Sequence, residues 1–139
     1  MRRLGLSIVA IALIGMLGAA SASAAAPSAF VGAWSSVDPV DDSIQHLLVM
    51  GGGGNVQMTY VDEYGTTCVE IAAPTVVFTG LLTGRIQGDD LFATFKQGGC
   101  GRVHVINASI RFAWTFHYDQ GTDTLFGAIE DGPATWYRD

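Results

Sequence analysis

Three histidines, His46, His104 and His117, are the side chains of this chain best suited to acid–base or metal chemistry. Such a site needs histidines, or a histidine and a carboxylate, to converge in space. No local spacing forces this, although His104 and His117 fall in one segment that can fold back on itself. The nucleophile pattern G-x-S-x-G does not occur, and Ser35 and Ser36 have no evident base. We therefore predict no catalytic residues and a protein that is not an enzyme.

Acidic pairs and a glycine run are the other chemical candidates. The pairs are Asp41-Asp42, Asp62-Glu63 and Asp89-Asp90. None belongs to an Asp-x-Asp-x-Asp-Gly calcium loop, so we interpret them as solvated turns. The glycines at 51–54 lie between two strand-like stretches, whereas a phosphate-binding loop leads from a strand into a helix. We expect a hairpin turn there, and neither a metal nor a cofactor.

The first 24 residues have the pattern of an export signal. Arg2 and Arg3 precede an apolar run at 4–17, and Ala22-Ser23-Ala24 matches a cleavage site. The run is shorter than the ~20 residues that span a bilayer. We expect a secreted or periplasmic protein with no stable membrane insertion after signal removal. The rest of the chain, residues 25–139, is long enough for one domain.

Charge and cysteine content narrow the possible partners and the compartment. Without Arg2 and Arg3, five basic residues remain against 13 acidic ones, a formal charge of −8. Such a chain is a poor nucleic-acid binder. Cys68 and Cys100 are the only cysteines, and an even count in an exported chain predicts a disulfide. A metal or redox pair is disfavoured because the pair lacks C-x-x-C spacing and a nearby histidine.

Apolar residues alternate along the chain after Pro27, and turn residues recur every 8–12 positions or so. The clearest alternation places Ile110, Phe112, Trp114, Phe116 and Tyr118 on one face of a strand. Strands are predicted at 30–37, 43–50, 55–62, 75–87, 91–96, 102–118, 123–129 and 134–138, with almost no helix. The short connections favour an all-β, up-and-down meander barrel of about eight antiparallel strands. A two-sheet sandwich is the main alternative.

Gly32 and Trp34 lie on the first predicted strand, and Trp136 and Arg138 lie on the last. In these residues the chain resembles the calycins, the lipocalin and avidin barrels, which carry an early Gly-x-Trp and a late arginine packed across the tryptophan. The resemblance implies that Arg138 or Trp136 contacts a buried Trp34 where the barrel closes, beside a Gly32 that must stay small. The long helix of many lipocalins is absent.

A second resemblance covers nearly all of residues 25–139. The segments "GAWSSVDPVDDS", "GGGGN", "YVDEYGTTC", "FTGLLTGRIQGDDL", "GGCG", "FHYDQGTDTL" and "ATWYRD" occur in that order. The chain is similar in them to small secreted bacterial proteins of unassigned function. This resemblance supports the barrel and the disulfide and implies no reaction.

The sequence favours an exported binding protein for a small apolar ligand or a partner. A barrel of this size can hold one ligand inside. The candidate lining residues are Trp34, Phe78, Phe95, Phe112, Trp114 and Phe116. The alternative is that these side chains simply fill the core. A protein-interaction, cell-envelope or inhibitor module is the second hypothesis, with Tyr60, Tyr64, Tyr118 and Tyr137 on its surface. An enzyme is the third, and would need His117 and a carboxylate to converge in a deep cavity.

Overall fold

The computed structural model describes residues 26–72, 76–106, 113–129 and 132–139. The elements are the 3₁₀ helix η1 (Pro27–Phe30), the strands β1 (Gly32–Val37), β2 (Ile44–Gly52) and β3 (Asn55–Asp62), the helix α1 (Thr66–Ala72), and the strands β4 (Phe78–Gln87), β5 (Asp90–Cys100), β6 (Val103–Ile106), β7 (Ala113–Asp119), β8 (Thr124–Ile129) and β9 (Gly132–Arg138). The predicted signal, residues 1–24, lies outside the described residues.

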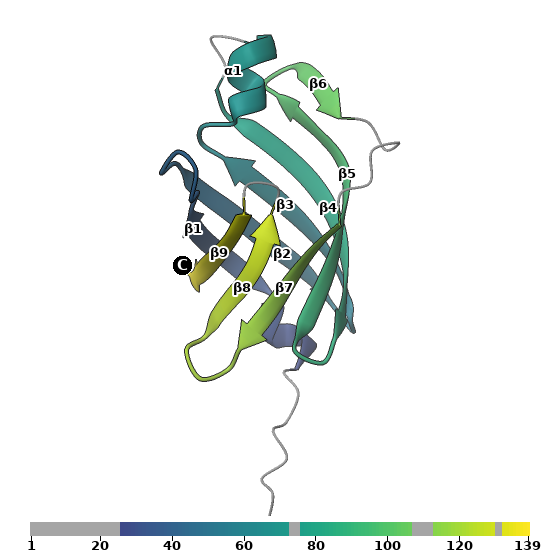
Figure 1. Cartoon of the computed structure of the whole chain (residues 1–139). Coiled ribbons are helices and arrows are strands. Elements are labelled where there is room, and N and C mark those ends of the chain that lie inside the picture. The colour runs from purple at the N-terminus through teal and green to yellow at the C-terminus, as the bar shows by residue number, and fades with distance from the viewer. Residues whose placement is uncertain (1–25, 73–75, 107–112, 130–131) are drawn as a thin grey trace, which may run out of the picture.

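The strands form a closed antiparallel barrel (Figure 1). Eight of them follow one another around the ring in the order β1-β2-β3-β4-β5-β7-β8-β9, and β9 pairs back onto β1. The predicted meander barrel of about eight strands is therefore confirmed, and the sandwich is wrong. η1 lies beside one end of the barrel and α1 beside the other. We call these the η1 end and the α1 end.

The long strand β5 has two successive partners along one of its sides. Its first half pairs with β7, between Asp90 and Thr94, and its last residues, Gly98 to Cys100, pair with β6. The single predicted strand at 102–118 is thus two separate strands. β6 extends the sheet at the α1 end, and residues 107–112 lie outside the described residues.

The prediction of almost no helix after Pro27 is confirmed, because η1 and α1 are the only helices among the described residues. The sequence does not predict the position of α1 itself. The seven residues of α1 are too few to form a stable helix in isolation. A disulfide anchors the helix to the barrel. Cys68 is fully buried and is bonded to Cys100 at the end of β5, with the two Cα atoms 5.4 Å apart. The predicted disulfide is confirmed. It fits an oxidising, extracytoplasmic environment.

The barrel core follows from the alternation of apolar residues along each strand. Interior positions on β2 and β3, such as Leu47, Val49, Val56 and Met58, are buried. In the described part of the chain, no helix has the length and apolar character needed to span a bilayer.

Gly80 and Gly98 provide the space that the aromatic side chains of the α1 end occupy. They pair directly across β4 and β5. A Cβ atom would lie 2.5 Å from the Phe95 ring at Gly80 and 2.6 Å from the Phe78 ring at Gly98. The two rings stack with centroids 6.0 Å apart. Two residues without side chains therefore position Phe78 and Phe95 inside this end of the barrel.

Candidate functional site

The η1 end is closed by the contact that the calycin resemblance implies. Trp34 is fully buried, and its indole Nε1 donates to the Phe30 carbonyl at 2.9 Å. The Arg138 guanidinium lies 4.1 Å from the centroid of the Trp34 ring. Gly32 has a φ of 144°, and a Cβ there would lie 2.8 Å from Arg138 Nη1. The expected Arg138–Trp34 contact is therefore present, and the guanidinium is what passes close to Gly32.

Asp123 completes this closure, and sequence reasoning missed it. Arg138 donates from Nε and Nη2 to the two Asp123 carboxylate oxygens, both at 2.8 Å. The Tyr118 hydroxyl donates to the same carboxylate at 2.9 Å. The hydrogen bonds from Arg138, and then from Tyr118, lower the pKa of Asp123 below its ordinary value. The sequence predicts Asp123 as the first residue of the strand at 123–129, whereas it lies in the turn just before β8. The partners lie on β7 and β9, which flank β8 in the sheet.

A series of ring contacts in the barrel interior joins four of the predicted lining residues, Phe78, Phe95, Trp114 and Phe116. Phe95 lies 6.1 Å from Trp114, and Trp114 lies 6.5 Å from Phe116, measured between centroids. Phe116 and Phe95 are buried, Trp114 is 7% exposed, and Phe78 is only partly buried. These four side chains therefore face the barrel interior, as lining residues must. The predicted lining residue Phe112 lies outside the described residues.

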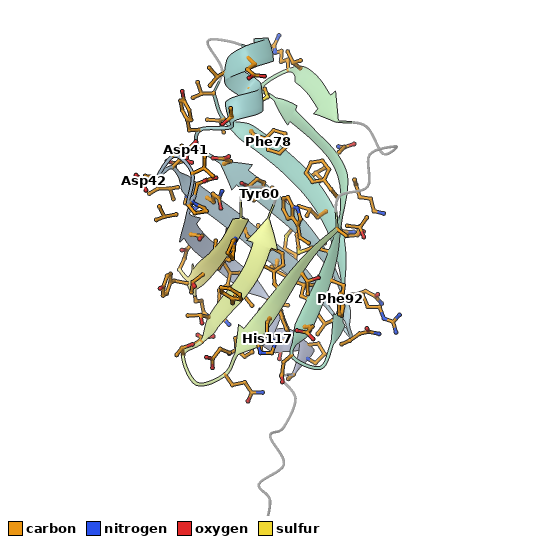
Figure 2. The ribbon with its side chains drawn as sticks, viewed as in Figure 1. Asp41, Asp42, Tyr60, Phe78, Phe92 and His117 are labelled. Atoms are coloured by element: carbon orange, nitrogen blue, oxygen red, sulfur yellow. A yellow bond between two sulfur atoms is a disulfide. The ribbon has the colours of Figure 1, made fainter. Side chains whose placement is uncertain are left out.

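Four polar side chains are buried toward the α1 end of the interior, and we call Ser36, Asp38, Gln45 and Asp62 the polar cluster. They come from the C-terminal half of β1, the residue after β1, the start of β2 and the end of β3. All four are at most 6% exposed. Asp62, expected in a solvated turn, is therefore inside the barrel wall. In Figure 2, Tyr60 and Phe78 lie toward the α1 end. Asp62 pairs with Phe78 across β3 and β4, so it belongs to the same end.

Hydrogen bonds hold both carboxylates of the polar cluster. Asp38 accepts from Gln45 Nε2 and from the Val40 backbone N–H, both at 2.6 Å. One Asp62 oxygen accepts from the Ser43 hydroxyl and the Tyr64 N–H, both at 3.0 Å. Burial raises the pKa of Asp62 above its ordinary value, and the nearby charges of Asp38 and Asp41 raise it further, against the lowering effect of these two hydrogen bonds.

Two buried polar atoms, Gln45 Oε1 and Trp136 Nε1, have no hydrogen-bond partner among the described residues. Both residues are fully buried. Ser36 pairs with Gln45 on one side, and on the other its hydroxyl donates to the carbonyl of Thr135, the neighbour of Trp136. Gln45 and Trp136 thus flank Ser36 from the two adjacent strands. An unpartnered buried group costs about 1–3 kcal/mol.

The orientation of the Gln45 amide follows from its neighbour. Its Nε2 faces the Asp38 carboxylate at 2.6 Å. Rotating the amide by half a turn would place two acceptors against each other. Oε1 is therefore the atom that lacks a donor.

Ser35 has a histidine base within reach on the outer face of the barrel, contrary to our expectation. Its Oγ lies 3.1 Å from His46 Nδ1, and His46 Nε2 lies 3.3 Å from Glu63 Oε1. The Ser35 hydroxyl, however, donates to an Asp139 carboxylate oxygen at 2.5 Å. β1 pairs with β2 and β9 at Ser35, which commits its backbone N–H to the sheet and removes it as an oxyanion donor.

His117 also meets a carboxylate, at a distance of 2.9 Å between its Nδ1 and Asp90 Oδ1. Both side chains are substantially exposed, so this pair lies on the surface and not in a deep cavity. The His104 side chain lies outside what the structure describes. The described residues contain no group of three histidine, cysteine or acidic side chains suited to a metal ion.

The tyrosines expected on an interaction surface are divided between the interior and the exterior. Tyr60 is buried, and its ring contacts Trp114 with centroids 5.2 Å apart. Tyr64 and Tyr137 are exposed. Tyr118 is partly buried at the η1 end. They therefore do not form one surface.

Comparisons with models of protein families, with curated proteins and with solved structures found no match to this chain.

Proposed function

We propose that this protein is a non-catalytic, extracytoplasmic binding protein that holds a small ligand inside the α1 end of its barrel. The observation that carries the proposal is a pair of buried polar atoms, Gln45 Oε1 and Trp136 Nε1, for which the described residues provide no hydrogen-bond partner. Small-ligand sites combine apolar walls with a few placed polar groups. At this end Tyr60, Phe78 and Trp114 supply the walls.

The chemistry of the two atoms indicates the group that they would bind. Gln45 Oε1 requires a donor, and Trp136 Nε1 requires an acceptor. A single hydroxyl group supplies both. The Trp136 ring also contacts Tyr60, with centroids 6.3 Å apart, so a hydroxyl bound there would be attached to an apolar body lying among aromatic rings. We therefore propose a small apolar ligand that carries a hydroxyl.

The η1 end does not offer such a site. Trp34, Phe30 and Phe116 are all fully buried there or in the middle of the barrel, and the Trp34 indole N–H already has its acceptor. Arg138 is engaged by Asp123 and by the carbonyls of Val31 and Ala29. The Trp34 indole and the Arg138 guanidinium are thus already engaged within the fold.

The test compares p-cresol with p-xylene, which differ only in replacing a hydroxyl by a methyl group. Indole N–H signals are followed by NMR in protein labelled with ¹⁵N. We expect p-cresol to shift the Trp136 Nε1 signal, to leave that of Trp34 in place, and to bind more tightly than p-xylene. The variant Gln45→Met should reduce the preference for p-cresol. Gln87→Met, the same change at an exposed position of β4, should not.

Two outcomes would contradict the proposal. In one, both compounds leave the Trp136 signal unchanged, and a long-lived water bridging Gln45 and Trp136 is found instead. In the other, both bind equally and Gln45→Met has no effect, so that the polar atoms do not select the ligand.

A further inference from the structure

The outer face of β2 to β6 carries three adjoining grooves that form one track along the barrel. Their volumes are about 640, 320 and 280 Å³. The first two share Met50, Gln57 and Thr83, and the last two share Leu81 and Gln97. Along β4 the track runs from Arg85 to Thr79, a length of about 20 Å for an extended strand.

The charge of this track is opposite to that of the molecule. The whole chain has a formal charge of −6. The track is lined by Arg85, Lys96 and Arg102, and none of its described lining residues is Asp or Glu. The fourth basic residue in the described part of the chain, Arg138, is paired with Asp123. The three track cations form no ion pair with any described residue.

Apolar side chains lie between these cations. Met50 and Phe92 are each 44% exposed and Leu81 is 42% exposed. Phe92 pairs with Arg85 across β4 and β5, and Figure 2 shows it on the outside of the barrel toward the η1 end. Exposed apolar side chains gathered in a groove mark a contact surface, and the polar Gln57, Thr83 and Gln97 provide hydrogen-bonding groups beside them.

We infer that this track is a docking surface for an extended, acidic segment of a partner protein that also carries apolar side chains. The cations select carboxylates, and Met50, Leu81 and Phe92 select apolar groups. A narrow groove about 20 Å long fits about six residues of extended chain. An acidic polysaccharide would leave the apolar side chains uncovered. An anionic membrane would be repelled by the rest of this acidic molecule. This inference is independent of the ligand proposed for the barrel interior.

The test measures binding of a fluorescent eight-residue peptide of alternating Asp and Leu, with a Lys and Leu peptide as its counterpart. We expect the acidic peptide to bind and the basic one not to bind. Added salt should weaken binding because exposed charges are screened. The variant Arg85→Gln/Lys96→Gln should bind about three- to tenfold more weakly, as expected for the loss of two exposed ion pairs.

The control carries the same change in charge on the opposite side of the barrel. Ala33→Glu/Phe126→Glu lowers the net charge by two at exposed positions of β1 and β8 and should leave peptide binding nearly unchanged. Equal binding of both peptides, or equal loss in both variants, would overturn the inference. So would tight binding of vesicles rich in anionic lipid that Arg85→Gln/Lys96→Gln abolishes, because the track would then be a lipid surface.

Discussion

Asp62 shows how the pKa of a single residue can depend on its place in the barrel wall. Its side chain is buried near a second carboxylate, that of Asp38, and it accepts hydrogen bonds from Ser43 and Tyr64. Its pKa is raised above the ordinary value of 3.8. A group whose pKa is higher in the folded state favours folding when it is protonated. Its stabilising contribution is complete below pH 3.8 and is lost as the pH rises through the raised pKa.

We predict that Asp62→Asn flattens this part of the stability profile. The asparagine oxygen can still accept from Ser43 and Tyr64, and the buried charge is gone. The free energy of unfolding, measured by urea denaturation at a series of pH values from about 3 to 7, should increase in the variant relative to the parent as the pH rises. Asp42→Asn, at an exposed position with a positive φ that asparagine tolerates, serves as the control. An unchanged slope in Asp62→Asn would show that Asp62 does not cause the dependence.

At the scale of elements, α1 and the ends of β5 and β6 are one unit joined by the disulfide. Gly65 and Cys68 illustrate how tightly the start of α1 is held: the Gly65 N–H donates to the Val76 carbonyl at 2.7 Å, and its own carbonyl accepts from the Cys68 N–H at 2.8 Å. A Cβ at Gly65 would lie 2.7 Å from that of Phe78. This unit therefore also fixes one wall of the proposed ligand site.

We predict that Cys68→Ser/Cys100→Ser destabilises the protein by about 3–4 kcal/mol, the cost of releasing a loop of this length. The loop spans a sequence separation of 32. Because α1 is too short to persist without its anchor, hydrogen exchange in α1 should rise well above that in β1, β2 and β9. The intact protein should have a mass two hydrogens below that of its reduced form. Free thiols in the folded parent, or unchanged exchange in α1, would contradict this account.

At the scale of the whole molecule, closure joins the first strand to the last. The described β1–β9 pairing consists of Trp34 with Arg138 and Ser35 with Tyr137, so this seam has few ladder positions. Side chains reinforce it: Arg138 bonds to Asp123 in the β7–β8 turn and to the carbonyls of Ala29 and Val31. One side chain therefore links η1, β1, β9 and the β7–β8 turn.

We predict that Trp34→Ala costs about 3–5 kcal/mol, because it removes a fully buried ring and leaves a cavity. Arg138→Ala should cost less, since the guanidinium is partly solvated, with 31% of its side chain exposed. Tyr137→Ala, at the neighbouring exposed position, should stay within about 0.5 kcal/mol of the parent. Thermal melts of the three variants provide the measurement. A melting temperature unchanged in Trp34→Ala would show that the seam does not depend on this ring.

Local pattern was enough for most of the fold. Alternation in segments such as β3 and β7 predicted strands, and the spacing of turn residues predicted a meander of about eight of them. The presence of two cysteines in a chain with an export signal predicted the disulfide. Alternation could not reveal α1, because a helix of seven residues has little intrinsic stability and leaves no clear helical pattern in the sequence. The alternation pattern also joined β6 and β7 into one predicted strand at 102–118, since both parts of that segment carry strand-like residues.

The candidate site was less accessible to sequence reasoning. Asp62 and Glu63 are adjacent acids in the chain, yet one is buried and the other exposed, and composition does not distinguish them. Gln45 lies at an interior position of β2, but in the sequence it cannot be distinguished from an outward-facing polar residue of a strand. Its unpartnered Oε1 is visible only when its surroundings are complete.

The sequence by itself determined the all-β class, the approximate number of strands, the disulfide and the acidic character of this protein, because these depend on composition and short-range periodicity. Only the tertiary structure decided that Arg138 meets Asp123, that Gln45 Oε1 and Trp136 Nε1 have no hydrogen-bond partner among the described residues, and that three cations line one outer track of adjoining grooves. Gln45 and Trp136 lie on strands far apart in the chain, and the other two features join residues on or beside neighbouring strands. The physical reason is that the register and curvature of a closed barrel choose such neighbours, and neither is encoded within any single segment.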